Sequence, residues 1–395
     1  MTKRVNSASR KQSARRSSGN CRLLSPGWNE KTRRALERLI DRGANKNLPV
    51  VFDFDNTLVA GDLQEATLAV LARTGKLTAA QIAATLSPSF RLPGKGRRTL
   101  LGSADITEYY EAFLSPTAHG DLDPTPMATG YAWAIEVLEG LRVSDVVDAT
   151  REICELSRLP SPGYIEAAPG KARFLVPTFY PEMVELVAAL IRNRFDVWIV
   201  SATNVWGVRC MVQSELNPKL RQHGVRVGLR PDHIIGVSTL MKDRHDHLYK
   251  DALLVKQNPR YAALDSKVTA NYTLTSRLQF PAPIYSGKVA CIFDAIGRAP
   301  YLCVGDSPGD IAMLNFSQNR LWIARLEKSD HRRQITRLMR VNGTDGWMLQ
   351  AISKVARLDF VPDLDAFARQ KMRLPDEMRV AARQLSVLSK RLGAG

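Results

Sequence analysis

Short apolar runs that stop abruptly at polar side chains recur along this chain and alternate with helical patterns, which constrains its fold more than any other feature. Strands that are joined through helices run parallel, and their carboxyl ends meet at one edge of a sheet. We therefore expect an α/β fold around a parallel sheet. The predicted strands are Leu48–Phe52, Asp196–Val200, Ile234–Leu240, Tyr301–Val304 and Arg320–Ala324, and the predicted helices are Tyr180–Asn193, Val205–Glu215, Lys288–Ile296 and Asp310–Phe316.

The same patterns divide the 395 residues into four parts. Residues 1–29 begin with a polar, Ser-rich stretch and are predicted to be a disordered basic tail. Residues 30–61 and 175–330 would form the sheet-containing core, and a mostly helical stretch over 62–174 interrupts it. Residues 331–395 are predicted to be a helical C-terminal extension, with helices over 350–357, 364–373 and 377–392.

The chain is strongly basic, with 56 Lys and Arg against 39 Asp and Glu and a net charge of +17, which favours anionic partners. Most of this excess lies in the two terminal segments, and residues 1–29 contain no acid at all. No recognised motif indicates a specific nucleic-acid site. We interpret the basicity as a clue to location or tethering: the tail is either a solvated segment or an address read by secretion or targeting machinery.

The five cysteines are irregularly spaced and predict neither a disulfide framework nor a Cys/His metal site. A reducing compartment is therefore the default. No apolar run approaches the roughly 18 residues of a membrane span. We expect a cytoplasmic protein, with secretion through a non-classical N-terminal signal as the alternative.

Polar groups that suit phosphate chemistry follow four of these segments. Val50-Val-Phe-Asp53-Phe-Asp55-Asn-Thr57 ends a strand in two carboxylates on the same side, which repel each other unless a cation or a shared proton intervenes. Ser201 ends a second strand before a helix, where free amides and a hydroxyl can hold phosphate oxygens. Lys288 begins a helix after Gly287, and Gly305-Asp306-Ser-Pro-Gly-Asp310 ends a further strand in two more carboxylates.

In this order, DFDNT, the strand-ending serine, GK and GDSPGD resemble the haloacid dehalogenase-like superfamily of aspartate-nucleophile phosphotransferases. The resemblance covers about residues 48–325. It implies a three-layer Rossmann-like core and a helical cap formed by residues 62–174, as in the phosphoserine-phosphatase-like branch. The stretches Asp62-Leu-Gln-Glu65-Ala66, Ser276–Phe280 and Arg320–Ile323 are similar to phosphorylcholine-phosphatase-type members.

The resemblance also implies roles for these residues. Asp53 would be the nucleophile that becomes an aspartyl phosphate, and Asp55 the general acid and then base. Asp53, the backbone carbonyl of Asp55 and Asp306 would hold Mg²⁺. Asp310 would support the metal shell from behind. Because Asp55 supplies the proton that a phosphate ester needs and a halide does not, dehalogenase activity is disfavoured.

The phosphoryl group would be held by Ser201, Lys288 and Thr57, and Thr57 would also orient the first loop. The expected function is a Mg²⁺-dependent phosphomonoesterase for a small phosphocholine- or phosphoserine-like metabolite. One alternative is a phosphotransferase that passes the phosphoryl group to another acceptor. The other is a secreted effector that acts on a host or protein substrate.

The cap segment is rich in aromatic residues, and these allow two interpretations. At helical spacing they fit the core of the cap. Alternatively, two or three of them, together with Glu65 or Glu108, would enclose a quaternary ammonium through cation–π contacts, as the phosphorylcholine-like resemblance implies. The candidates are Tyr109, Tyr110, Phe113, Tyr131 and Trp133.

Overall fold

A seven-stranded sheet forms the centre of the computed structural model, which describes residues 21–86, 90, 102–114, 129–171, 173–354, 358–370 and 374–392. The strands lie in the order β14-β13-β12-β11-β1-β6-β7, and all neighbours pair in parallel except β14, which runs antiparallel to β13. This confirms the α/β class and the parallel sheet. The strands are β1 (Pro49–Phe52), β6 (Asp196–Asn204), β7 (Ile234–Val237), β11 (Leu302–Gly305), β12 (Asn319–Arg325), β13 (Trp347–Lys354) and β14 (Leu358–Val361).

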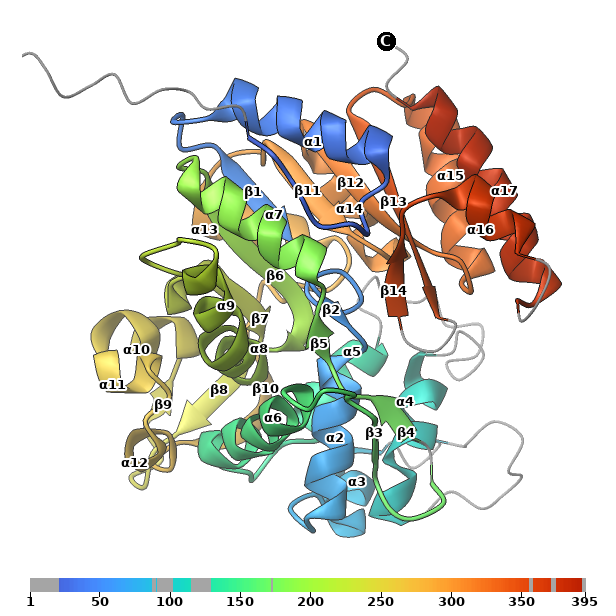
Figure 1. The fold of residues 1–395 in the computed structure, drawn as a ribbon. Coiled ribbons are helices and arrows are strands. Elements are labelled where there is room, and N and C mark those ends of the chain that lie inside the picture. Colours follow the sequence, from blue (N-terminus) through green and yellow to red (C-terminus); the bar gives the residue numbers. More distant parts are fainter. Residues whose placement is uncertain are drawn as a thin grey trace, which may run out of the picture.

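Helices cover both faces of this sheet and complete three layers (Figure 1). In β1, Val50 and Phe52 pack into one hydrophobic cluster and Val51 into another, as the alternation of a doubly covered strand requires. The first face carries α1 (Glu30–Gly43), α7 (Pro181–Arg192), α8 (Val205–Met211) and α9 (Asn217–Gln222). The second carries α13 (Gly287–Ile296), α14 (Ile311–Phe316), α15 (Ser329–Asn342), α16 (Leu364–Arg369) and α17 (Asp376–Arg391).

A mostly helical insertion follows β1 and lies beyond the end of the sheet (Figure 1). The chain leaves the core along β2 (Val59–Ala60) and returns along β5 (Thr178–Phe179), and these two short strands pair antiparallel. The exit and the return are therefore fixed side by side. Between them lie α2 (Leu63–Arg73), α3 (Ala79–Thr85), α4 (Ile106–Leu114), α5 (Thr129–Glu136), α6 (Val143–Ser157) and the hairpin of β3 (Tyr164–Glu166) and β4 (Arg173–Leu175).

A second, smaller insertion follows β7 and packs against the first. The strand predicted over Ile234–Leu240 is divided between β7 of the central sheet and the first strand of a separate three-stranded sheet. Backbone bonds tie this sheet to the link between α5 and α6: the amide of Gly140 donates to Leu274 at 3.0 Å and that of Val143 to Tyr272 at 2.9 Å. The second insertion contains β8 (Thr239–Lys242), β9 (Leu248–Tyr249), β10 (Thr273–Leu278), α10 (Asp251–Gln257), α11 (Pro259–Ala262) and α12 (Ser266–Thr269).

The helix predicted over residues 350–357 is wrong, because β13 extends over Trp347–Lys354 and widens the central sheet. Seven of its eight residues are buried, so no alternation of polar and apolar residues distinguishes the strand from a buried helix. The other two predicted helices of this region correspond to α16 and α17. The C-terminal part of the chain is thus partly an extension of the sheet and not wholly helical.

The predicted disorder of residues 1–29 is wrong for residues 21–29, while residues 1–20 lie outside the described part of the chain. Leu23 and Trp28 are buried in the core. The carboxylate of Glu185 on α7 accepts the amides of Leu24 at 2.5 Å and Ser25 at 3.0 Å, and the indole of Trp28 at 3.3 Å. Residues 21–29 thus form a strap across the core.

Among the described residues, none of the helices combines the length and the apolar character that a membrane span needs.

The strap gives a stability prediction. Trp28 is 4% exposed and packs edge-on against Phe360 at 5.2 Å. We expect Trp28→Ala to lower the free energy of unfolding by about 3–5 kcal/mol in denaturant titrations, since it leaves a large cavity and removes one of the hydrogen bonds to the Glu185 carboxylate. Leu24→Ala is the matched control, because Leu24 is 78% exposed, and its change should stay within about 0.5 kcal/mol. Equal effects of the two substitutions would contradict a packed strap.

Candidate functional site

The carboxyl ends of three adjacent strands, β11, β1 and β6, bring the predicted motif residues together. Asp53 follows β1, Ser201 lies in β6, and Asp306 follows β11. The amide of Asp53 donates to the carbonyl of Val304 on β11 at 2.9 Å, which continues the strand pairing up to the site. Lys288 and Asp310 approach the same edge, Lys288 from the first turn of α13 and Asp310 from the turn that precedes α14.

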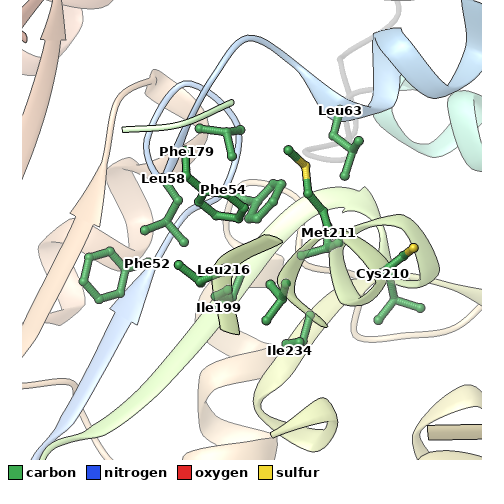
Figure 2. Close-up of a cluster of buried hydrophobic side chains, with 14 of the residues drawn as sticks. Phe52, Phe54, Leu58, Leu63, Phe179, Ile199, Cys210, Met211, Leu216 and Ile234 are labelled. Carbon is green, nitrogen blue, oxygen red and sulfur yellow. The ribbon is translucent and has the colours of Figure 1, made fainter. Parts of the chain in front are cut away.

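In the loop after β1, successive side chains point alternately into the hydrophobic core and into a cavity, and this alternation places the two carboxylates. Phe52 and Phe54 point into the hydrophobic core, where Figure 2 shows Phe54 beside Phe179. Asp53 and Asp55 line a cavity instead. Thr57 is fully buried, and its hydroxyl donates to Asp53 Oδ2 at 3.2 Å. Thr57 therefore orients the Asp53 carboxylate, and it is not among the residues that line the cavity. Its predicted contact with phosphate stays a prediction.

Lys288 is the positive charge of the site. Its ammonium donates to Asp53 Oδ1 and to Asp310 Oδ1, both at 2.6 Å, and its side chain is buried. Burial alone would lower the pKa of Lys288, but the carboxylates of Asp310 and Asp53 outweigh it and raise the pKa. The lysine is therefore charged at neutral pH and neutralises part of the acidic cluster.

Asp53, Asp306 and Asp310 form a compact acidic cluster, in which one ligand oxygen from each lies within 4.8 Å of the others. Burial and the charge of Asp310 raise the pKa of Asp53 to about 6, against the influence of Lys288. Burial also raises the pKa of Asp306 well above its ordinary value. A hard divalent cation with oxygen ligands would relieve this repulsion, so the donor set fits Mg²⁺.

Asp310 is better suited to supporting this cluster than to binding the cation. Its Oδ1 accepts from Lys288, and its Oδ2 accepts the amides of Asp306 at 3.1 Å and Ser307 at 3.0 Å. Gly305 allows this close approach, because a Cβ there would lie 2.6 Å from the Cβ of Asp310. Asp310 thus fixes the loop that carries Asp306.

Asp55 is half-buried beside Asp53 but has different neighbours. Its Oδ1 accepts the amide of Leu63 at 2.7 Å, and its Oδ2 accepts the hydroxyl of Thr203. Burial and the nearby charge of Asp62 raise the pKa of Asp55 well above its ordinary value. A carboxyl group with a raised pKa holds its proton at higher pH and can donate it, which suits a general acid.

Thr203 has no assigned role in the sequence interpretation, although it lies two residues after Ser201. Residues two apart in a strand share a face, so the spacing was an available signal. Thr203 lines the cavity, whereas Ser201 is fully buried and its hydroxyl accepts the amide of Thr203 at 3.1 Å. The structure therefore places Ser201 behind Thr203 at this wall.

A cavity of about 460 Å³ opens between the sheet edge and the first insertion. Glu65 and Tyr110 line it as the cage interpretation expects, and Tyr131 stands between Tyr110 and Tyr285 with ring centroids at 6.5 and 6.0 Å. Its other lining residues include Asp62, Leu114, Arg173, Ile284, Arg325, Lys328, His331 and Lys354.

Two of the predicted substrate contacts, Tyr109 and Trp133, do not line this cavity. Both are buried inside the cap, where they pack with Phe113 and Phe90. The indole of Trp133 donates to Thr85 at 2.9 Å within the cap. The placement of these two residues favours the interpretation that they form the core of this insertion.

Comparison with known proteins agrees with this geometry. The chain is 26% identical over 310 residues, 76% of its length, to the phosphorylcholine phosphatase of Pseudomonas aeruginosa, of which the match covers 81%. A solved structure of a conserved protein of unknown function from Anaerococcus prevotii shares the fold, with a TM-score of 0.55 and 20% identity over 86% of this chain and 98% of that one. No protein-family model matches. The curated relative confirms the predicted resemblance to phosphorylcholine phosphatase.

The acidic cluster gives a metal-binding prediction that needs no activity. Saturating Mg²⁺ should raise the melting temperature by a few degrees, because a ligand at about 100 times its dissociation constant adds about 2.7 kcal/mol to the stability of the folded state. Asp306→Asn should abolish the shift. The control is Asp246→Asn, an exposed acid at positive φ where Asn is well tolerated, and it should leave the shift intact. A full shift in Asp306→Asn would contradict this cation site.

Proposed function

We propose that this relative of phosphorylcholine phosphatase is a Mg²⁺-dependent phosphomonoesterase that acts on a small phosphorylated metabolite through an aspartyl phosphate. The enzyme class follows from the curated relative. The mechanism is supported chiefly by one observation, the different environments of two neighbouring carboxyl groups. Asp53 is bound by the ammonium of Lys288 and by Thr57 at the cavity floor, whereas Asp55 is bound by the Leu63 amide and the Thr203 hydroxyl and has a pKa well above its ordinary value.

In the first half-reaction, a carboxylate oxygen of Asp53 attacks phosphorus and forms a new P–O bond. The bond from phosphorus to the ester oxygen breaks, and Asp55 gives its proton to that oxygen so that the product leaves as a neutral alcohol. Lys288 lies 2.6 Å from Asp53 Oδ1, so its charge is placed to stabilise the transferring phosphoryl group. Thr57 keeps the nucleophile aligned throughout.

In the second half-reaction, Asp55 takes a proton from water while the water oxygen attacks the phosphorus of the aspartyl phosphate. The bond between phosphorus and Asp53 breaks and inorganic phosphate leaves. Asp53, Asp306 and the backbone carbonyl of Asp55 would hold Mg²⁺. When bound, the cation supplies charge stabilisation to the phosphoryl oxygens and offsets the repulsion among the carboxylates.

The substrate we favour is a small phosphorylated amine, phosphocholine- or phosphoserine-like. A cavity of about 460 Å³ accommodates a metabolite of that size above the phosphoryl site. Tyr110, Tyr131 and Tyr285 offer aromatic rings, and Glu65 and Asp62 offer carboxylates, so this wall suits an ammonium group.

The nucleophile assignment predicts the effect of one substitution. Asp53→Asn should lower kcat for p-nitrophenyl phosphate by at least about 10³-fold, because an amide oxygen does not attack phosphorus. Asp246→Asn should retain full turnover, and circular dichroism should show both variants folded. Mg²⁺-dependent turnover by Asp53→Asn at the unsubstituted rate would overturn the mechanism.

Thr203 should position Asp55 without reacting itself. We expect Thr203→Val to lower kcat by about tenfold with little change in KM, because Asp55 loses the hydroxyl that holds its Oδ2. Thr203→Ser retains a hydroxyl and should restore most of the rate. Were the serine variant as slow as the valine variant, the role of this hydrogen bond would be excluded.

A further inference from the structure

The wall of the cavity nearest the C-terminal part of the chain is basic. Arg325 ends β12, Lys328 directly precedes α15, and Lys354 ends β13, and all three line the cavity. We call these three residues the basic wall. His331 lies beside them, and burial together with the charges of Arg325 and Lys328 lowers its pKa to about 4, so it is neutral at neutral pH.

The charges of the basic wall are only partly matched by protein groups. Arg325 donates through Nε to Glu327 at 2.8 Å, and its Nη1 lies 3.7 Å from Asp306. Lys328 and Lys354 are exposed, and neither makes an ion pair with any residue in the described ranges. Lys328 and Lys354 therefore lack an anionic partner among the described residues.

Lys328 and Lys354 make no ion pair with the acidic cluster that would bind the transferring phosphoryl group, whereas Arg325 approaches Asp306. That cluster is neutralised in part by Lys288, whose ammonium is bound by Asp53 and Asp310 at the cavity floor. Arg325 and Lys328 instead lie close enough to Glu65 to favour its charged form, while burial and Asp62 act in the opposite direction and raise its pKa to about 8. With this pKa Glu65 is largely protonated at neutral pH, so the outer cavity has one side lined by carboxyl groups and tyrosines and one basic side.

We propose that the basic wall is a subsite for a second anionic group on the substrate, a carboxylate or a second phosphoryl group carried by the leaving alcohol. The proposal rests on the phosphatase function proposed above and narrows its substrate class. Lys328 and Lys354 would pair with that anion, and Arg325 would add its charge from the floor side. A leaving group with an ammonium and a carboxylate would match both sides of the cavity, whereas a purely cationic one would face two unmatched lysines.

Matched substrate pairs test the subsite with the full-length chain and Mg²⁺. Phosphoserine and phosphoethanolamine differ by one carboxylate, and 2-phosphonoethyl phosphate and ethyl phosphate differ by one phosphonate, so the pairs separate the two kinds of anion. We expect kcat/KM for the anion-bearing member of at least one pair to be higher by about tenfold, mainly through KM, as one charge-assisted contact supplies.

Variants then assign that preference to the basic wall. In Lys328→Gln/Lys354→Gln the ratio within the preferred pair should fall to within about twofold of unity, as a charge-dependent contact requires. The double Lys→Arg variant keeps both charges and should keep the ratio. Lys250→Gln, which removes an exposed lysine away from the cavity, is the matched control and should also keep it.

The outcomes distinguish the two proposals. Absence of hydrolysis of every ester, p-nitrophenyl phosphate included, would overturn the phosphatase function itself. Hydrolysis with equal kcat/KM within both pairs would leave that function standing and overturn the subsite. The subsite would also be overturned if the double glutamine variant slowed both members of a pair equally, because the lysines would then attract phosphate esters in general.

Discussion

The two hydrogen-bonded ion pairs that Lys288 makes with Asp53 and Asp310 are the interaction on which the site depends. Two buried carboxylates this close to Asp306 would repel one another strongly without a cation. The ammonium joins a residue at the end of β1 to one in the turn before α14, and so connects three parts of the chain that are far apart in sequence. It also leaves the other oxygen of Asp310 to bind the amides that shape the Asp306 loop.

The sheet makes this arrangement possible because β1 lies between β11 and β6. The carboxyl end of β1 is therefore flanked by β11, which is followed by Asp306, and by β6, which contains Thr203. Phe52 and Phe54 keep the strand end fixed in the hydrophobic core, so that the two aspartates between and after them face the cavity. The reactive groups are thus positioned by rigid packing and not by long mobile loops.

The sequence was sufficient to predict the parallel core and its motif residues, because each strand ends where an apolar run meets a polar group. It was not sufficient for β13, which is buried on both faces and has no alternation. Because of that error, the position of Lys354 in the basic wall could not be predicted, since Lys354 lies at the cavity as the last residue of β13. In the cap, Tyr109 and Tyr110 are neighbours about 100° apart around α4. Only the packing of that helix decides that Tyr110 faces the cavity while Tyr109 fills the cap interior.

The attachment of the second insertion to the first has a mechanical consequence. The three-stranded sheet is hydrogen-bonded to the link between α5 and α6, and the chain that leaves its last strand, β10, runs directly to α13 and Lys288. Ala282 and Ile284 on that connection also pack in one cluster with Ile135 of α5. The segment that carries Lys288 is therefore anchored to the first insertion as well as to the core. A shift of that insertion against the core would reach the hydrogen bond between Lys288 and Asp53 through this stretch of backbone.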